Sequence, residues 1–406
     1  MDKPDPQPFK ASLLFERFGI WMALLTLVVA IWYRFIPLIV LAVFFLVIAG
    51  LITIWKRKAL TNVSADMKLD RRRVFAGEHV TLSAALENRK WLPLIWLEWE
   101  MVKQEGIVWG KEESEGYMLR LLWLLSYQKA SWEVEARVEN RGVYHVGRVI
   151  LRSGDGFRFT EEEKQVDIRI VLYAYPQLLS VTVPPLTPVR QWGLGQNGGF
   201  LEDPVLISGI RDYQSGDEWR KINWPASART GKLQTTIHQP VKPRQLMIVI
   251  DVRGFSSGRQ QAFEWFLSVI ASVAVRYHQQ GLHIGYASNA LDHEENPIGF
   301  AKPGSGITSF MDELAKMTPA VNPRKPDLGS MLPTDELACP LFLFADCLRK
   351  EYGHWLRAHH QFTDNLFCYY VGENEAANDQ ASQWGRMSAR KMDVLVTPAK
   401  RKRDAG

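Results

Sequence analysis

The chain opens with two long apolar runs separated by a single charge, and no other feature constrains its fold as strongly. Phe18 to Tyr33 contains no charged residue, Arg34 follows, and Phe35 to Trp55 is again uncharged. A helix needs about 20 apolar residues to cross the hydrocarbon core of a bilayer, and the second run supplies them. The first run is shorter but is flanked by aromatic residues that suit the membrane interface. We therefore expect residues 1–60 to form a transmembrane helical hairpin.

Charge around the two runs predicts their orientation. Lys3, Lys10 and Arg17 precede the pair, and Lys56 to Lys58 follow it, whereas only Arg34 lies in the loop. The positive-inside rule then predicts a multi-pass protein of the cell membrane with the bulk of the chain in the cytoplasm. A cleaved signal peptide is disfavoured because no small-residue cleavage site follows the first run. The alternative is one span with a re-entrant first helix, which would put the bulk of the chain outside.

The net charge of +5 is concentrated in basic clusters. Lys56 to Lys58 and Arg71 to Arg73 follow the apolar segment, and a third cluster lies in a basic tail, residues 399–406. Clusters beside a membrane span favour contact with anionic lipid headgroups. Nucleic acid is not expected as a partner because no nucleic-acid-binding motif accompanies the charge. The three cysteines form no C-x-x-C pair, which fits a reducing compartment.

Residues 61–185 are predicted to form a β-sandwich-like domain. Trp132 to Val138 alternates cleanly, with Trp132, Val134, Ala136 and Val138 on one face, and further short apolar segments are separated by turn residues. Leu119 to Leu125 is bulkier and fits either a strand or a membrane-facing loop. No chemistry is evident here, so the domain is either a spacer or a partner surface.

Residues 245–398 alternate between strand and helix patterns and predict a doubly wound parallel sheet. Gln245 to Asp251 and Leu341 to Ala345 are near-continuous apolar runs typical of buried parallel strands. The further expected strands are Leu282 to Ala287, Asn365 to Val371 and a closing Asp393 to Val396, and the expected helices are Gln260 to Gln280, Ile307 to Met317 and Glu351 to His360.

Ligands of such sheets bind beyond the carboxyl ends of the strands, where Asp251 and Asp346 are expected. With Thr308 from a glycine-rich loop, they are weak candidates to hold a divalent cation such as Mg²⁺. The layout resembles the von Willebrand factor A domain, whose metal site needs Asp-x-Ser-x-Ser after the first strand. Arg253 and Phe255 replace both serines, and Arg253 would place a fixed cation where the metal charge would lie. We therefore expect no metal and no other cofactor.

Residues 186–244 form a linker and a signature segment. Gly-x-Ser-x-Gly, H-E-x-x-H and the P-loop pattern are all absent from the chain, which predicts that the protein is not an enzyme. The remaining enzymatic alternative is a hydrolase or transferase centred on Asp217 and His238, although no nucleophile stands beside them. The glycine-rich stretch Gly193 to Gly199 is interpreted as a flexible interdomain loop.

The signature itself resembles a known family. The pattern is Arg211-x-Tyr213-x-x-Gly216-Asp217-x-x-Arg220-x-Ile222-x-Trp224, followed by Ala228-Arg229. With Arg141-Gly142-x-Tyr144 and Tyr175-Pro176, it resembles the bacterial domain-of-unknown-function-58 family of membrane-anchored proteins with an A-like C-terminal domain. Ser153-Gly154-Asp155-Gly156-Phe157 departs from the Asp-Pro-Phe-Gly of relatives. The resemblance implies association with MoxR-type AAA ATPases and envelope-linked roles, without an established activity.

Two interpretations of the signature remain. Arg211, Arg220 and Arg229 offer bidentate donors, and Asp217 is the obvious acceptor. The segment is either a clasp of ion pairs and tryptophans that locks onto the A-like sheet, or a clasp that also docks a partner through its surplus arginines. We expect a non-enzymatic membrane adaptor or scaffold that works with a MoxR-type ATPase. The alternative is a divalent-cation-dependent binding module.

Overall fold

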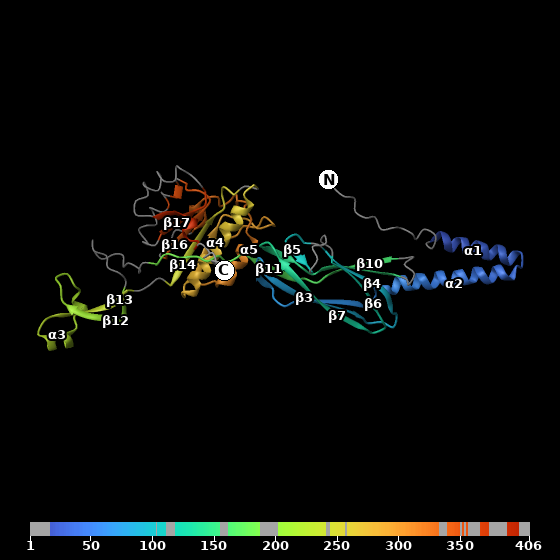
Figure 1. The fold of residues 1–406 in the computed structure, drawn as a ribbon, viewed down its shortest axis with the longest axis horizontal. Helices are drawn as coiled ribbons and strands as arrows, with labels where there is room; N and C mark the ends of the chain where they lie inside the picture. The colour runs from blue at the N-terminus through green and yellow to red at the C-terminus, as the bar shows by residue number, and fades with distance from the viewer. Residues whose placement is uncertain are drawn as a thin grey trace, which may run out of the picture. The chain divides into compact units, whose positions relative to one another are not determined.

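The computed structural model describes most of the chain between residues 17 and 397. The described ranges are 17–102, 104–110, 118–154, 161–186, 202–240, 244–255, 258–332, 339–349, 351–352, 355, 366–372 and 388–397. The predicted loop at 193–199, the basic tail and most of the predicted helix at 351–360 lie outside them. The chain divides into two compact units, Met1–Ala174 and Tyr175–Gly406, and each is described by itself (Figure 1).

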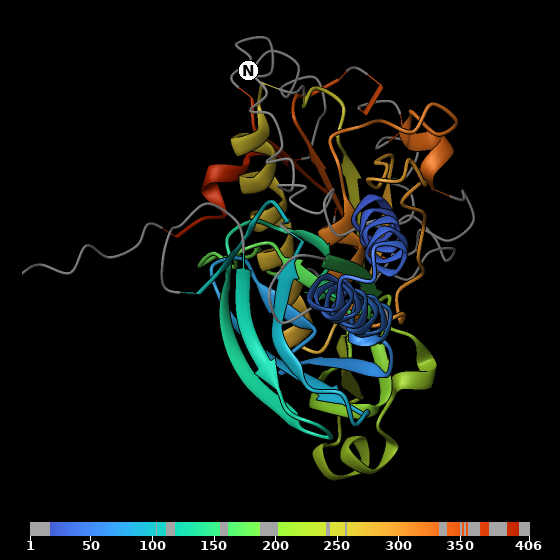
Figure 2. The same cartoon turned by 90° about the vertical axis from the view of Figure 1, so that its right-hand side faces the viewer.

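Two apolar helices open the first unit. α1 spans Arg17–Trp32 and α2 spans Ile36–Ala59, with Arg34 at a φ of 54° in the turn between them. Figure 2 shows the two helices end-on and side by side. Pro37 lies in the first turn of α2, where a missing amide hydrogen costs no hydrogen bond. By length and composition α2 can cross a membrane, whereas the apolar part of α1, Ile20–Trp32, is shorter.

The rest of the first unit is rich in β-strands, as its alternating segments predict. Two four-stranded sheets have the orders β1-β3-β7-β5 and β10-β9-β4-β6, and their paired strands are antiparallel. A third, three-stranded sheet has the order β2-β11-β8. The strands are β1 (Val63–Leu69), β2 (Arg73–Phe75), β3 (His79–Asn88), β4 (Leu94–Met101), β5 (Ile107–Trp109), β6 (Met118–Leu124), β7 (Lys129–Val138), β8 (Gly142–His145), β9 (Arg148–Gly154), β10 (Glu161–Asp167) and β11 (Val171–Tyr175).

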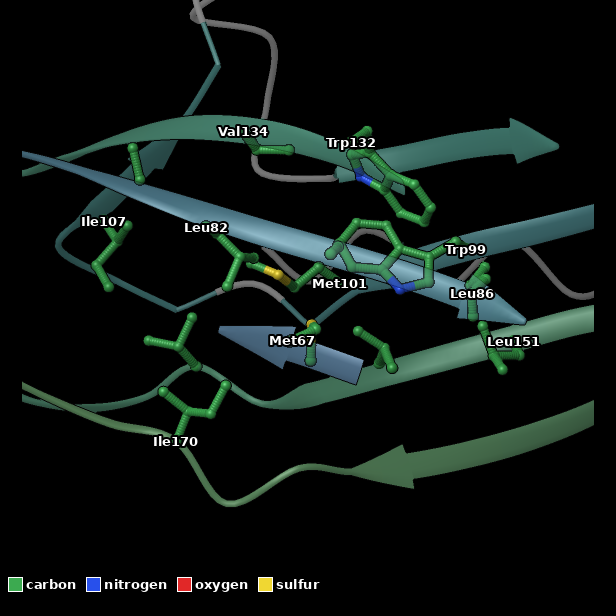
Figure 3. Packing of buried hydrophobic residues seen from close by; sticks show 14 of the residues in the cluster. Met67, Leu82, Leu86, Trp99, Met101, Ile107, Trp132, Val134, Leu151 and Ile170 are labelled. Atoms are coloured by element: carbon green, nitrogen blue, oxygen red, sulfur yellow. The ribbon is translucent and has the colours of Figure 1, made fainter. Parts of the chain in front are cut away.

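The two four-stranded sheets share one hydrophobic core (Figure 3). On β7, Trp132, Val134, Ala136 and Val138 are buried while their neighbours are exposed, which confirms the predicted alternation. The Trp132 ring meets Trp99 of β4 edge-on, with 5.4 Å between ring centroids. Edge-to-face packing of this kind adds to the free energy gained by burying the rings.

The second unit begins with a long antiparallel hairpin. β12 (Glu202–Asp212) pairs with β13 (Gln234–Pro240). Between the strands lie a short 3-10 helix, η1 (Trp219–Lys221), and a two-turn helix, α3 (Trp224–Thr230). The signature therefore folds as a helical insertion at the end of a β-ribbon.

The remainder of the second unit contains a five-stranded parallel sheet with the order β15-β14-β16-β17-β18. α4 and α5 pack on one face through ring contacts such as Tyr277 with Phe342, and Met331 and Tyr352 pack with a separate cluster that includes Val249. The elements are β14 (Gln245–Asp251), α4 (Gln260–Gln279), β15 (His283–Ser288), α5 (Ile307–Lys316), α6 (Leu328–Met331), β16 (Leu341–Ala345), β17 (Leu366–Tyr370), β18 (Ser388–Lys391) and the 3-10 helix η2 (Met392–Val394).

One predicted strand is wrong. The sheet ends with β18, and the segment predicted to close it, Asp393 to Val396, begins inside η2. Val396 instead makes an isolated antiparallel bridge with Val181. β18 is mostly polar, whereas Asp393 to Val396 contains three consecutive apolar residues, so hydrophobicity alone favours the wrong segment.

Candidate functional site

Asp217 is the centre of a polar cluster that folds the signature back onto its own hairpin. Its carboxylate accepts from Arg211 at 2.6 Å, from the backbone amide of Gln214 at 3.0 Å and from the Thr235 hydroxyl at 3.2 Å. Gly216 allows the intervening turn because its φ of 111° is unfavourable for a side chain. The hydrogen bond from Arg211, followed by that from Gln214, holds the pKa of Asp217 below its ordinary value. Asp217 is therefore ionised and committed to structure at neutral pH.

Two residues outside the predicted set fix α3. The Asn223 side chain caps the helix by accepting from the Ala226 amide at 3.0 Å. Ser227 donates to the Asn223 carbonyl and accepts from the Gln234 amide, both at 2.8 Å, so it joins α3 to β13. An Asn followed by Trp-Pro is a recognisable helix start that sequence reasoning missed.

The outer surface of the insertion combines exposed aromatic rings with unpaired cations. Trp219 and Trp224 are 68% and 62% exposed, and the Trp219 ring contacts Tyr213 with 5.7 Å between centroids. Arg220 and Arg229 are exposed, and within the described part of the chain neither forms an ion pair. Of the predicted arginines, only Arg211 reaches Asp217. We call Trp219, Arg220, Trp224 and Arg229 the hairpin tip.

The second candidate site lies at the carboxyl edge of the parallel sheet. Strand order reverses between β14 and β16, the usual place for ligands in such sheets, and Asp251 ends β14 there. Its fully buried carboxylate accepts from the Arg253 guanidinium at 2.6 and 2.9 Å, from Asn289 at 2.8 Å and from the Tyr352 hydroxyl. Both oxygens of the Asp251 carboxylate thus accept hydrogen bonds from protein groups.

Arg253 supplies the positive charge at this edge. Besides Asp251, its guanidinium pairs with Asp327 at 3.0 Å and with Glu351. Burial, the largest influence, raises the pKa of Asp251, but the hydrogen bonds from Arg253, Tyr352 and Asn289 outweigh it and the pKa is lowered. Burial and the neighbouring carboxylate raise the pKa of Tyr352. The two pKa shifts together favour an ionised Asp251 beside a neutral Tyr352.

Asp346 follows β16 and has its own arginine. The Arg259 Nη1 atom lies 2.6 Å from Oδ1 of Asp346. The two groups form an ion pair, but their angles do not meet those of a hydrogen bond. Gly254, at a φ of 99°, passes so close to this carboxylate that a β-carbon there would overlap it. A Gly254 substitution would therefore push Asp346 aside.

The structure does not bring Thr308 to these two aspartates. After β15 the chain turns back, so that Ala301 bridges Tyr286 and Pro303 lies against Gly285 near the amino end of that strand. Thr308 follows in the first turn of α5, exposed and at the opposite edge of the sheet from Asp251. Among the described residues, no group of three His, Cys, Asp or Glu side chains could hold a metal ion. Asp251 and Asp346 are each paired with an arginine, which does not fit a cation site.

His238, the partner of Asp217 in the enzymatic alternative, lies on β13 opposite Ile207. The Asp217 carboxylate accepts hydrogen bonds from Arg211, Gln214 and Thr235, and Arg211 carries a full positive charge. A general base needs a free lone pair facing its substrate, and three hydrogen bonds already occupy lone pairs of the Asp217 carboxylate.

Two of the solved structures that match this chain do so only distantly. The sporulation control protein Spo0M of Bacillus subtilis matches 29% of this chain and 51% of its own at 12% identity, with a TM-score of 0.18. A family GH20 exo-β-N-acetylglucosaminidase of Vibrio harveyi matches 81% of both chains at 10% identity, with a TM-score of 0.20. Scores this low carry no argument about fold or activity.

Sequence comparisons are more informative. The family model described as "Protein of unknown function DUF58" matches residues 209–375, which begin at the signature and include most of the parallel sheet. The uncharacterized protein YeaD of Bacillus subtilis (strain 168) is 26% identical over 270 residues, or 66% of this chain. The chain spans 64% of the length of that relative. The resemblance read from the signature is thereby confirmed: residues 209–375 match the DUF58 family of proteins of unknown function.

Proposed function

We propose that this protein is a membrane-anchored, non-enzymatic adaptor that presents the hairpin tip to a protein partner. The observation that carries the proposal is the pair of tryptophans, more than 60% exposed, beside two arginines that form no ion pair with any described residue. Trp and Arg are the residues that most often dominate binding energy at protein interfaces. Because both rings stay exposed, their burial free energy is not gained on folding and is available to a partner that covers them.

The Asp217 cluster supports this role because it makes the tip rigid. Asn223 and Ser227 fix α3, and Arg211 with Asp217 fixes the turn before it. A rigid surface loses little conformational entropy on binding, so more of the contact energy appears as affinity. The family resemblance suggests a MoxR-type AAA ATPase as the partner, in envelope-related assembly.

The proposed architecture completes the adaptor. We take α1 and α2 as two membrane spans with the bulk of the chain in the cytoplasm, because Arg57 and Lys58 are exposed at the end of α2. The β-rich region is proposed as a sandwich-like spacer and the parallel sheet as an A-like domain. In that domain Arg253 takes the place of a metal charge, so the cation-dependent alternative has no observation in its favour.

Photo-crosslinking in native membranes tests the proposal. A photoreactive amino acid in place of Trp219 or Trp224 should capture one protein, and Arg220→Ala with Arg229→Ala should reduce its yield. Arg324→Ala, another exposed arginine of the second unit, is the matched control and should leave the yield unchanged. Capture of no specific protein, or equal loss with the control, would contradict a docking role for the tip.

A further inference from the structure

The end of α2 is built into the β-rich region rather than joined to it by a linker. Buried Lys90 donates from its ammonium group to the carbonyls of Ala59 at 2.5 Å and Thr61 at 3.0 Å, which caps the helix with a positive charge. The Arg89 amide donates to the Asn62 carbonyl at 3.0 Å. Ala59 and Leu60, 0% and 3% exposed, belong to the β-rich core. The depth of α2 in a bilayer therefore sets the depth of the strands next to it.

That depth follows from helix geometry. The apolar part of α2, from Ile36 to Trp55, is about 30 Å long at 1.5 Å per residue, which equals the thickness of the hydrocarbon core. Ala59 lies about 6 Å further along the helix axis. The polar interface on each side of a bilayer is about 5–7 Å deep, so Ala59 and the groups bonded to it stand at its outer limit.

Four large side chains are exposed at this same end of the β-rich region. Trp91, Trp123, Leu125 and Tyr127 are 65%, 74%, 64% and 70% exposed. Trp91, Leu125 and Tyr127 lie on two turns that are bonded to each other and to Lys90, and Trp123 lies next to them in the last part of β6. The connecting bonds run from the Tyr127 amide to the Lys90 carbonyl at 3.2 Å, from the Ser126 hydroxyl to the Trp91 carbonyl, and from the Asn88 side chain to the Leu125 carbonyl at 3.0 Å.

We infer that these four residues, the interfacial rim, insert into the lipid headgroup layer and hold the β-rich region against the membrane. Trp and Tyr favour this layer because one end of each ring system is apolar and the other forms hydrogen bonds. The occupant is lipid because the rim is continuous with the span of α2, and exposed Arg57 and Lys58 on the last turn of α2 match anionic headgroups.

The rim also defines where membrane contact stops. Leu119 and Leu121 continue the same face of β6 and are 53% and 57% exposed. At 3.3 Å per residue, Leu119 lies about 20 Å from Leu125 along β6. Only the last part of β6 and the adjoining turns are assigned to lipid, so β6 is a strand whose end faces the membrane.

Site-directed spin labelling of the full chain in nanodiscs that contain anionic lipid tests this inference. Single nitroxides replace Trp91, Tyr127 or, as a control, Glu139, which lies exposed at the far end of β7, in a Cys347→Ser background. At Trp91 and Tyr127 the ratio of relaxation by oxygen to relaxation by a water-soluble nickel complex should be several-fold higher than at Glu139. A label at Val43 in the middle of α2 reports insertion of the helix, on which this inference and the proposed function both rest.

The outcomes separate the two ideas. A lipid-like ratio at Val43 with water-like ratios at Trp91 and Tyr127 would overturn the interfacial rim and leave the anchor intact. A water-like ratio at Val43 would overturn both. Dipolar broadening at Trp91 that disappears when labelled chains are diluted with unlabelled chains would instead identify a second copy as the occupant and overturn the assignment to lipid. Slower amide exchange of residues 125–128 in nanodiscs than in micelles should confirm the result in the unsubstituted chain.

Discussion

Removing Arg253 should destabilise the parallel sheet in a way that depends on pH. The substitution Arg253→Met keeps most of the side-chain volume and removes the charge that faces Asp251. Asp251 is 0% exposed, so its carboxylate would lose the only cationic partner that it has among the described residues, without gaining water. Breaking one partner of a buried pair typically costs 3–5 kcal/mol. Because Tyr352 and Asn289 still donate to Asp251, we expect the lower end, about 3 kcal/mol at pH 8.

The pH dependence follows from the direction of the pKa shifts. In the parent chain the pKa of Asp251 is below its unfolded value, so its contribution to stability is present above that value and is lost as pH falls through the folded pKa. In Arg253→Met, burial dominates and the folded pKa rises above the unfolded one. The folded variant then binds more protons than the unfolded chain, so its stability falls as pH rises, by up to about 1.4 kcal/mol per pH unit. The deficit should be smaller at pH 5 than at pH 8.

Amide hydrogen exchange measures the loss of stability locally, because peptides from β14 and β16 report opening of the parallel sheet without unfolding of the first unit. About 3 kcal/mol corresponds to a loss of protection of roughly 150-fold at pH 8. The double variant Asp251→Asn, Arg253→Met should recover much of the lost protection, because no buried charge remains at position 251. Arg324→Met serves as the surface control. A loss below about 1 kcal/mol, or the same loss at pH 5 and pH 8, would refute the account of Asp251 as a buried carboxylate that depends on Arg253.

Three further predictions concern the hairpin and the sheet edge. Asn223→Ala removes the cap of α3 and should cost about 1 kcal/mol of local stability, seen as faster exchange in α3 with β14 unchanged. Because the pKa of Asp217 is lowered, its contribution to the stability of the hairpin should be present at neutral pH and be lost as the pH falls below its unfolded pKa. Asp217→Asn should abolish this acid sensitivity of amide exchange in peptides that cover the Arg211 to Asp217 turn. An unchanged acid sensitivity in the variant would contradict the prediction. Millimolar Mg²⁺, Ca²⁺ or Mn²⁺ should give no calorimetric heat and no thermal shift. Saturable metal binding that is present in the parent chain and absent in Asp251→Asn would show that a metal can displace Arg253 from Asp251.

Much of the fold could be predicted from local pattern. The alternation of Trp132 to Val138 and the apolar run of Gln245 to Asp251 have periods that follow directly from strand geometry. The apolar length of α2 was equally clear. The edge strand of the parallel sheet was not, because its position depends on which short segment pairs with β17, and pairing is a long-range property.

The candidate site could be predicted only in part. The signature identified Arg211 and Asp217 as charged neighbours, and the structure joins them. The number of free arginines and the exposure of the tryptophans required coordinates, because both depend on how the insertion folds. Thr308 looked close to Asp251 only because a helix after a strand suggests a common edge. An antiparallel return along β15 carries it to the other edge, and no sequence period reports such a return.

The central claim is that the hairpin tip binds a protein partner, and quantitative recovery of that partner from membranes tests it most directly. The double variant Trp219→Ala, Trp224→Ala removes the two exposed rings, and hydrogen exchange of β12 and β13 should confirm that the hairpin remains folded. Since an interface residue of this kind contributes 2 kcal/mol or more, recovery of the partner should fall at least about tenfold relative to the parent chain and to Arg324→Ala. Recovery of the same proteins at the same yield from the folded double variant would contradict the claim.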